Sequence, residues 1–104
     1  MDVKPCQIVY LPLFENDLEE TYDYIADTLR NAVAAKRLVL AVRDAIHERA
    51  FNPTGFKPYE PSTSLEDTYY RINVGNYSVF YVVFGHTMEV RRLIYSRRDL
   101  PRLL

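Results

Sequence analysis

The chain has 104 residues, of which 48% are hydrophobic, 26% charged and 13% aromatic, so we expect one compact domain over residues 1–104. Nine tyrosines and five phenylalanines supply large apolar faces, which excludes a disordered chain. The formal net charge of −1 excludes a protein that binds nucleic acid by bulk positive charge alone.

The sequence shows no signal for export or membrane insertion. Cys6 is the single cysteine and cannot form a disulfide within the chain. No run approaches the ~20 apolar residues of a membrane-spanning helix, and residues 1–7 lack the charged and apolar regions of a secretion signal. We therefore expect a cytoplasmic protein with no membrane partner.

Charge is unevenly distributed along the chain. Residues 1–35 carry a net charge of −5, residues 36–70 are neutral, and residues 71–104 carry +4. Every basic residue of the last segment is an arginine, whose guanidinium group binds phosphate or carboxylate through two parallel hydrogen bonds. These residues are Arg71, Arg91, Arg92, Arg97, Arg98 and Arg102.

The first third of the chain predicts a short strand and a helix. Residues 7–11 are mainly β-branched and aromatic, as in a strand, and Pro12 ends them. Over residues 13–29, apolar residues recur every three or four positions between acidic ones, which predicts an amphipathic helix. Its apolar stripe consists of Leu18, Tyr22, Ile25 and Leu29.

A second helix is predicted from Ala32 to about Ala50, with Asn31 as its N-cap and Asn52-Pro53 beyond its end. Because the connection between the two helices is short, we expect an antiparallel hairpin that presents both apolar stripes to one surface. The second stripe consists of Ala35, Leu38, Val39, Val42 and Ile46.

The second half of the chain predicts a loop and three strands. Residues 52–68 contain three prolines and several small polar residues, typical of an ordered but irregular loop. Strands over residues 69–74, 77–84 and 88–95 are separated by short glycine-containing segments, as in antiparallel hairpins. The middle strand is apolar on both faces and belongs at the centre of the sheet, one face of which the helices cover. The fold class is therefore α+β, with an N-terminal strand, an antiparallel helix hairpin and a three-strand antiparallel meander.

Several of these segments together resemble the RelE/ParE superfamily of bacterial toxins. The main likeness lies in YRINVGNYSVFYVVF (70–84) and VRRLIYSRRDL (90–100), because a G-N-Y-x-V-F-Y hairpin followed by R-R-D at this separation is a fairly specific pair. Upstream, the likeness extends to the first helix and to the end of the second, so it covers nearly the whole chain. The residues concerned are Asp17, Leu18, Tyr24, Ile25, Ala34, Ala35, Arg37, Leu38, Asn52 and Pro53.

The resemblance implies the toxin half of a type II toxin-antitoxin, or plasmid stabilisation, module, which arrests growth unless a labile antitoxin wraps it. RelE-like members are mRNA interferases, endoribonucleases that cut mRNA in the ribosomal A site without a metal. ParE-like members bind DNA gyrase and have no known RNase activity. The implied partners are a cognate antitoxin and either the ribosome with mRNA or gyrase. Operator DNA would be contacted only through the antitoxin, and no cofactor or metal is expected.

Metal-free RNA cleavage sets the chemistry against which the candidate residues are judged. It requires deprotonation of the 2′-hydroxyl, neutralisation of the extra charge on the in-line phosphorane and protonation of the leaving 5′-oxygen. By resemblance, Arg98 matches a catalytic arginine of RelE proteins, Arg71 lies near their basic strand residues, and Tyr95 occupies the position of a strand-end histidine or tyrosine. The candidate catalytic residues are therefore Arg71, Tyr95 and Arg98.

The candidate residues for contact with RNA or another target are Tyr77, Arg92 and Arg97. A tyrosine at a strand end can reach a nucleotide by stacking or through its hydroxyl. We expect Arg71, Arg92 and Arg98 to form one cationic surface, mounted on the sheet that the two helices support.

Two departures from the RelE pattern weigh against nuclease activity. Ser78 stands where RelE-like nucleases commonly carry a catalytic arginine, and the chain ends in Leu103-Leu104 without the tyrosine that follows their catalytic arginine. The net charge of −1 is also low for a ribosome-binding protein. mRNA cleavage and gyrase inhibition both stay open, as does an inactive antitoxin-binding or interaction module.

Structural alternatives exist for the strand arginines. Arg91 and Arg92 are adjacent in a predicted strand, so they should point to opposite faces, and at most one belongs to a site on a given face. Arg71 could pair with Glu89 across the meander.

Arg97 and Arg98 are expected to contact the antitoxin. An amphipathic antitoxin helix could lie between the helix hairpin and the sheet, or an extended segment could add to an exposed strand, with its acidic side chains meeting these arginines. The structural alternative is a salt bridge to Asp99 or to the acidic first helix.

Overall fold

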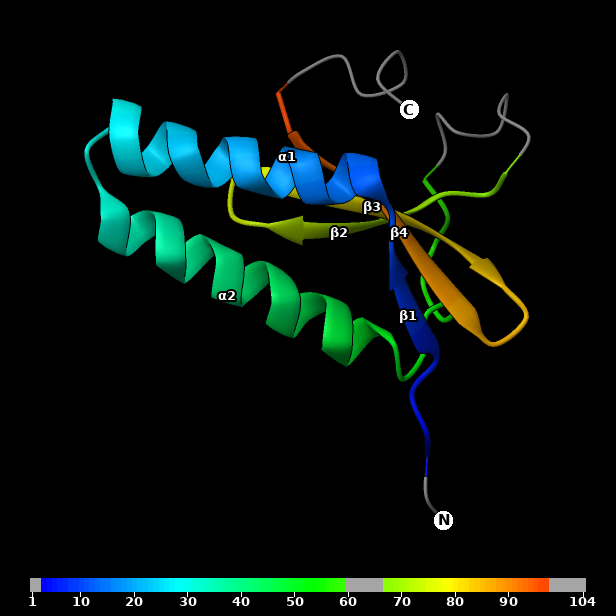
Figure 1. Cartoon of the computed structure of the whole chain (residues 1–104). Helices are drawn as coiled ribbons and strands as arrows, with labels where there is room; N and C mark the ends of the chain where they lie inside the picture. The colour runs from blue at the N-terminus through cyan, green and yellow to red at the C-terminus, as the bar shows by residue number, and fades with distance from the viewer. Residues whose placement is uncertain (1–2, 60–66, 98–104) are drawn as a thin grey trace.

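The protein has two layers, with its helices on one face of a four-stranded sheet (Figure 1). We describe a computed structural model, which covers residues 3–59 and 67–97. Its elements are β1 (Gln7–Tyr10), α1 (Pro12–Asp23), the π-helix η1 (Tyr24–Thr28), α2 (Ala32–Arg49), β2 (Tyr70–Val74), β3 (Tyr77–Phe84) and β4 (Thr87–Tyr95). This order confirms the predicted α+β fold class. Within these two ranges, no helix combines the length and the apolar character needed to cross a membrane.

The sheet has the strand order β1-β4-β3-β2. β2, β3 and β4 pair antiparallel, as predicted, through turns in which Gly75 and Gly85 each have a φ of 57°. Glycine adopts such a positive φ at little cost, which explains why both hairpin turns contain one. β1 pairs in parallel with the other side of β4, so the sheet is mixed. β3 lies between two partners, which confirms its predicted central position.

β3 is apolar on both faces because each face contributes to a different core. Val79 and Tyr81 belong to the larger cluster, which includes residues of both helices, and we call this side of the sheet the helix face. Phe80 and Val82 alternate with them and belong to a smaller cluster on the opposite side, the loop face. There Tyr59, in the segment after α2, packs edge-on against Phe80 with ring centroids 5.1 Å apart.

The apolar stripe predicted for the first helix is wrong at two positions. Tyr22 and Leu29 are 38% and 56% exposed, whereas Phe14, which the prediction omitted, is buried. α1 also continues into η1, where the Leu29 N–H donates to the Tyr24 carbonyl at 3.0 Å. Because a π-helical turn holds an extra residue, it shifts the helical phase and moves Leu29 away from the buried side.

The predictions for α2 are confirmed. The Asn31 side chain caps the helix, since its Oδ1 accepts a hydrogen bond from the Ala34 N–H at 3.1 Å. Ala35, Val42 and Ile46 of the predicted stripe are fully buried. α2 therefore runs back along α1 as the second arm of an antiparallel hairpin over the sheet (Figure 1).

Asp17 of α1 binds the outer edge of β4. β1 pairs with β4 only as far as Val90, so the edge beyond it lacks a strand partner among the described residues. There the Asp17 carboxylate accepts the Leu93 N–H at 3.0 Å and two bonds from Arg92, from Nε at 2.7 Å and from Nη2 at 3.1 Å. A two-bond guanidinium–carboxylate contact is stronger than a neutral hydrogen bond, so Asp17 holds α1 against the sheet.

Asp17→Ala is expected to lower the free energy of unfolding by about 2 kcal/mol, because hydrogen bonds to a guanidinium group and to a backbone N–H are lost together. Urea unfolding followed by circular dichroism measures the change. Asp23→Ala removes an exposed carboxylate from the same helix and should cost less than about 0.5 kcal/mol. Equal losses for the two variants would show that Asp17 contributes nothing beyond its charge.

Candidate functional site

A polar cluster lies on the loop face where β2, β3 and the end of β4 meet. Ser78 is 0% exposed, and its Oγ accepts a hydrogen bond from Arg71 Nε at 2.8 Å. The same oxygen lies 2.8 Å from Ser96 Oγ and 3.4 Å from Asn73 Oδ1, to which it donates. The β2–β3 register places Asn73 opposite Ser78 and so assembles the group. We call Arg71, Asn73, Ser78 and Ser96 the Ser78 cluster.

Arg71 is the cationic member of this cluster. Its guanidinium carbon lies 5.7 Å from the centroid of the Tyr59 ring and 6.0 Å from that of Phe80. The alternative that Arg71 pairs with Glu89 is wrong, because Glu89 binds Arg91. Within the ranges that the structure covers, no carboxylate pairs with Arg71. Its terminal nitrogens are therefore available to an anion.

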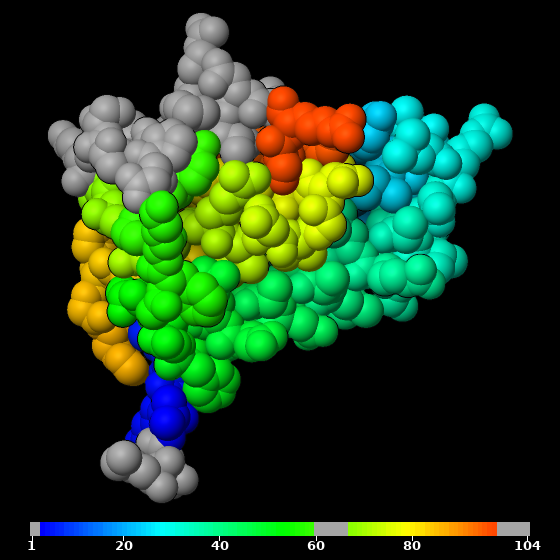
Figure 2. Space-filling model, turned by 180° about the vertical axis from the view of Figure 1, so that it is seen from behind, coloured from blue at the N-terminus to red at the C-terminus, as the bar shows by residue number. Residues whose placement is uncertain are grey.

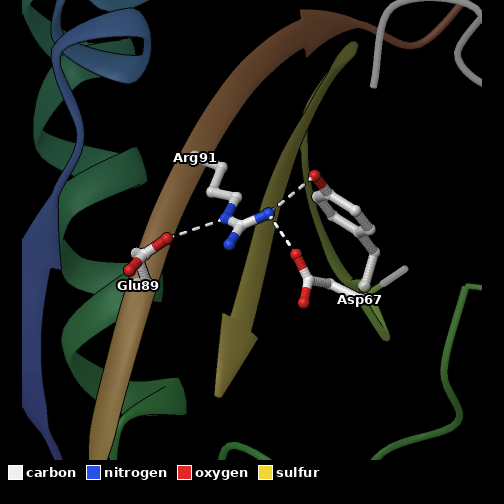
Figure 3. Close-up of polar contacts among 4 residues, drawn as sticks. Asp67, Glu89 and Arg91 are labelled. Atoms are coloured by element: carbon white, nitrogen blue, oxygen red, sulfur yellow. Dashed lines mark hydrogen bonds and ion pairs between the residues drawn. The ribbon is translucent and has the colours of Figure 1, made fainter. Parts of the chain in front are cut away.

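Arg91 attaches the segment before β2 to β4 (Figure 3). Its Nε donates to Glu89 at 2.8 Å, and its Nη1 donates to Asp67 at 2.8 Å and to the Tyr69 hydroxyl at 3.1 Å. Burial alone would lower the pKa of Arg91, but these hydrogen bonds raise it above its usual value. A register shift in the β3–β4 pairing leaves Arg91 as an extra residue in the strand. Its charge is therefore used to hold the fold.

Arg92 binds a different carboxylate from Arg91, Asp17 of α1. The bulge at Arg91 interrupts the strand alternation on which the expectation of opposite faces depended. The hydrogen bonds to Asp17 raise the pKa of Arg92. Arg71 and Arg92 both pair with Phe80, from opposite sides of β3, but among the described residues the hydrogen bonds of the Arg92 side chain go to Asp17 and not to the Ser78 cluster. Arg97 is exposed and has no hydrogen bond or ion pair with any residue that the structure describes. Arg98 lies outside the described residues, so its membership of a common cationic surface stays a prediction.

Tyr77 and Tyr95 lie together at the end of the sheet, with ring centroids 5.5 Å apart. They line a cleft with Tyr24 of η1, on the helix face. Burial raises the pKa of Tyr77, and the nearby hydroxyls of Tyr24 and Tyr95 raise it further. The two predicted site tyrosines are thus adjacent, but Arg71 lies on the other face of the sheet.

Sequence reasoning missed three residues that complete the loop-face surface, Asn73, Ser96 and Tyr59. Ser96 had a partial signal, because it directly follows the predicted strand; the observed register places Ser78 opposite Ile94, and Ser96 is two residues further on the same face. Tyr59 had none, since its contact with Phe80 depends on how the loop returns over the sheet. Among the described residues, no group of three or more His, Cys, Asp or Glu side chains could hold a metal ion.

Comparison with known proteins identifies the class. The sequence profile of the family described as ParE toxin of type II toxin-antitoxin system, parDE, matches residues 8–100. This range spans most of the chain, and the expected RelE/ParE superfamily membership is confirmed. The chain belongs to the ParE toxin family.

Two solved structures are similar to this chain. One is from the chromosomal ParDE toxin-antitoxin system of P. aeruginosa, with 12% identity, a TM-score of 0.72, and coverage of 86% of this chain and 95% of that chain. The other is from the RelB-RelE antitoxin-toxin complex of Methanococcus jannaschii, with 25% identity, a TM-score of 0.46, and coverage of 84% and 88%. The first of these shares the fold. A search of curated proteins gave no match.

Ser78→Ala is expected to release the Arg71 side chain. The Arg71 Nε–H, bonded to a buried oxygen, should exchange with solvent about tenfold faster in this variant, which corresponds to the loss of one hydrogen bond. NMR exchange measurements on the arginine Nε–H groups test this. Ser96→Ala keeps the Arg71–Ser78 bond and serves as the control. An unchanged Arg71 exchange rate in Ser78→Ala would mean that Ser78 does not hold this arginine.

Proposed function

We propose that this toxin of a type II toxin-antitoxin module arrests growth by binding a target protein rather than by cutting mRNA. DNA gyrase is the target implied by the resemblance to ParE-like toxins. One observation carries the proposal: Ser78, at the position where RelE-like nucleases commonly have a catalytic arginine, is buried and engaged by Arg71 and Ser96. This position therefore offers no arginine side chain that could bind a phosphate.

The remaining groups of the Ser78 cluster also support binding over cleavage. Cleavage needs one group to take the 2′-hydroxyl proton and another to protonate the leaving oxygen. Arg71, Asn73, Ser78 and Ser96 include a cation, an amide and two alcohols, but no histidine or carboxylate. Tyr95, a candidate catalytic residue, lines a cleft on the helix face instead. A proton-transfer pair beside Arg71 is therefore not found among the described residues.

mRNA cleavage is the second candidate, and Arg71 favours it. Its guanidinium group lies beside an aromatic ring and has no carboxylate partner within the described ranges, so a phosphate could bind there with a base stacked on Tyr59. Arg98, outside the described residues, would have to supply the second cation.

A cognate antitoxin is the proposed partner that neutralises the toxin. β2 is the last strand of the sheet, so its outer edge offers backbone groups to an extended segment. Arg97 follows the end of β4 and is exposed, and the N–H of its neighbour Ser96 donates to the Asn76 carbonyl in the β2–β3 turn at 2.8 Å. We propose that acidic residues of the antitoxin cover Arg97 and Arg98, that operator DNA is bound only through the antitoxin, and that the module acts in the cytoplasm.

The target is tested with the purified chain in two assays. We expect inhibition of DNA supercoiling by gyrase, and intact messages when the chain is added to translating ribosomes. In cells, expression without antitoxin should induce the DNA-damage response. Ribosome-dependent cleavage that Arg71→Ala abolishes, with supercoiling unaffected, would instead establish the nuclease. If cells that express the chain without antitoxin grow normally, the chain is an interaction module and neither a gyrase inhibitor nor a nuclease.

The antitoxin contact is tested by charge reversal. The double variant Arg97→Glu, Arg98→Glu should bind the antitoxin at least about tenfold more weakly, and its binding should depend less on salt, because like charges then face each other. The double variant Lys36→Glu, Arg37→Glu makes the same charge change on exposed positions of α2. If both variants bind equally well, the antitoxin does not cover Arg97 and Arg98.

A further inference from the structure

A cleft of about 730 Å³ opens where the ends of several elements meet. It lies between the end of α1 with η1, the start of α2, the β2–β3 turn and the end of β4. Figure 2 shows the red end of β4 above the yellow-green β2–β3 turn and beside the blue-cyan end of α1. The volume is in the range of ligand pockets. The lining residues are Glu20, Thr21, Tyr24, Ile25, Leu29, Asn31, Ala34, Asn76, Tyr77 and Tyr95.

Three tyrosine rings gather on one part of this lining. The rings of Tyr77 and Tyr95 are tilted by 59° to one another at a centroid distance of 5.5 Å. The Tyr24 hydroxyl is near enough to Tyr77 to influence its ionisation. The faces of aromatic rings carry partial negative charge and attract a cation that lies over them.

Among the described residues, Glu20 is the only charged side chain in the lining. It has no hydrogen bond or ion pair within the described part of the chain. Glu20 is close enough to Arg92 to affect its pKa, but Arg92 already has a carboxylate partner in Asp17. Among the described residues, the Glu20 carboxylate at the cleft therefore has no ion-pair partner of its own. Arg30 is next to two lining residues in sequence, and Arg97 is two residues beyond Tyr95, yet neither lines the cleft.

The rest of the lining is apolar and suits the stem of a long side chain. Ile25, Leu29 and Ala34 provide aliphatic surface beside the tyrosines. Ile25 also belongs to the π-helical turn, and its carbonyl accepts the Asn31 N–H at 3.0 Å. Such turns occur frequently at functional sites. Here the turn places Tyr24 and Ile25 together in the cleft wall.

We propose that this cleft binds an arginine side chain of a partner protein, with the guanidinium group held between the tyrosine rings and the Glu20 carboxylate. Arginine fits better than lysine because its planar group stacks on aromatic rings and donates two parallel bonds to a carboxylate. Its three methylene groups would lie on the aliphatic surface. An acidic or phosphorylated ligand is disfavoured by Glu20. The site is on the helix face and is separate from the Ser78 cluster, so it is independent of the choice between gyrase and mRNA.

The test uses Nα-acetyl-L-argininamide as the probe and the neutral isostere Nα-acetyl-L-citrullinamide as its control. In NMR titrations of the full chain, the arginine probe should shift the backbone amide signals of Ala34 and Asn76, and the citrulline probe should not. Glu20→Gln should weaken binding about two- to fivefold, the range of an exposed ion pair. Tyr24→Ala, at a position 52% exposed, should weaken it by a similar factor. Glu19→Gln makes the same charge change outside the cleft and should have no effect.

Several outcomes would overturn the proposal. Equal shifts with the arginine and citrulline probes would show that positive charge is not recognised. Equal weakening of probe binding by Glu19→Gln and Glu20→Gln would show that the overall charge of the chain, and not the position of Glu20 in the cleft, determines the affinity. Stronger binding of Nα-acetyl-L-leucinamide would identify an apolar side chain as the occupant. Shifts of the same amides with protein concentration alone would identify a second copy of this chain.

Discussion

The contact between Asp17 and the outer edge of β4 is the interaction on which the arrangement of the other parts depends. β1 is short, so β4 continues beyond it with backbone groups that would otherwise lack a protein partner. Asp17 supplies an acceptor for the Leu93 N–H and a counter-charge for Arg92 at the same point. This fixes the position of α1 on the sheet. Because η1 continues α1, the same contact also determines where Tyr24 meets Tyr77 and Tyr95.

The arginines of the last third of the chain differ in the chemical groups to which they bind. Arg91 and Arg92 bind carboxylates, so their charges are neutralised within the fold. Arg71 is instead held by the neutral hydroxyl of Ser78, which orients the side chain without cancelling its charge. A net charge of +4 over residues 71–104 therefore overstates the positive charge that a ligand meets. On the described part of the sheet, the cationic site is essentially Arg71.

The two candidate surfaces lie on opposite sides of one sheet. The Ser78 cluster is on the loop face, with Tyr59 and Phe80 beside it. The tyrosine cleft is on the helix face, bounded by α1, η1 and α2. Strand alternation causes this separation, since Tyr77 and Ser78 are consecutive and must point to opposite sides. The two proposed contacts therefore use different faces and do not overlap.

The sequence by itself determined the order of the elements, the α2 cap, the glycine turns and the family. These features depend on residues a few positions apart, whose periodicity, backbone preference or capping chemistry acts within one helix or turn. The tertiary structure alone decided the parallel pairing of β1, the partners of each arginine and the positions of Ser96 and Tyr59. Asp17 and Arg92 are 75 residues apart, and no local pattern states which of the many carboxylates an arginine will meet. That choice depends on which backbone edge is left open after the strands have paired, and so it emerges only when the whole chain is packed.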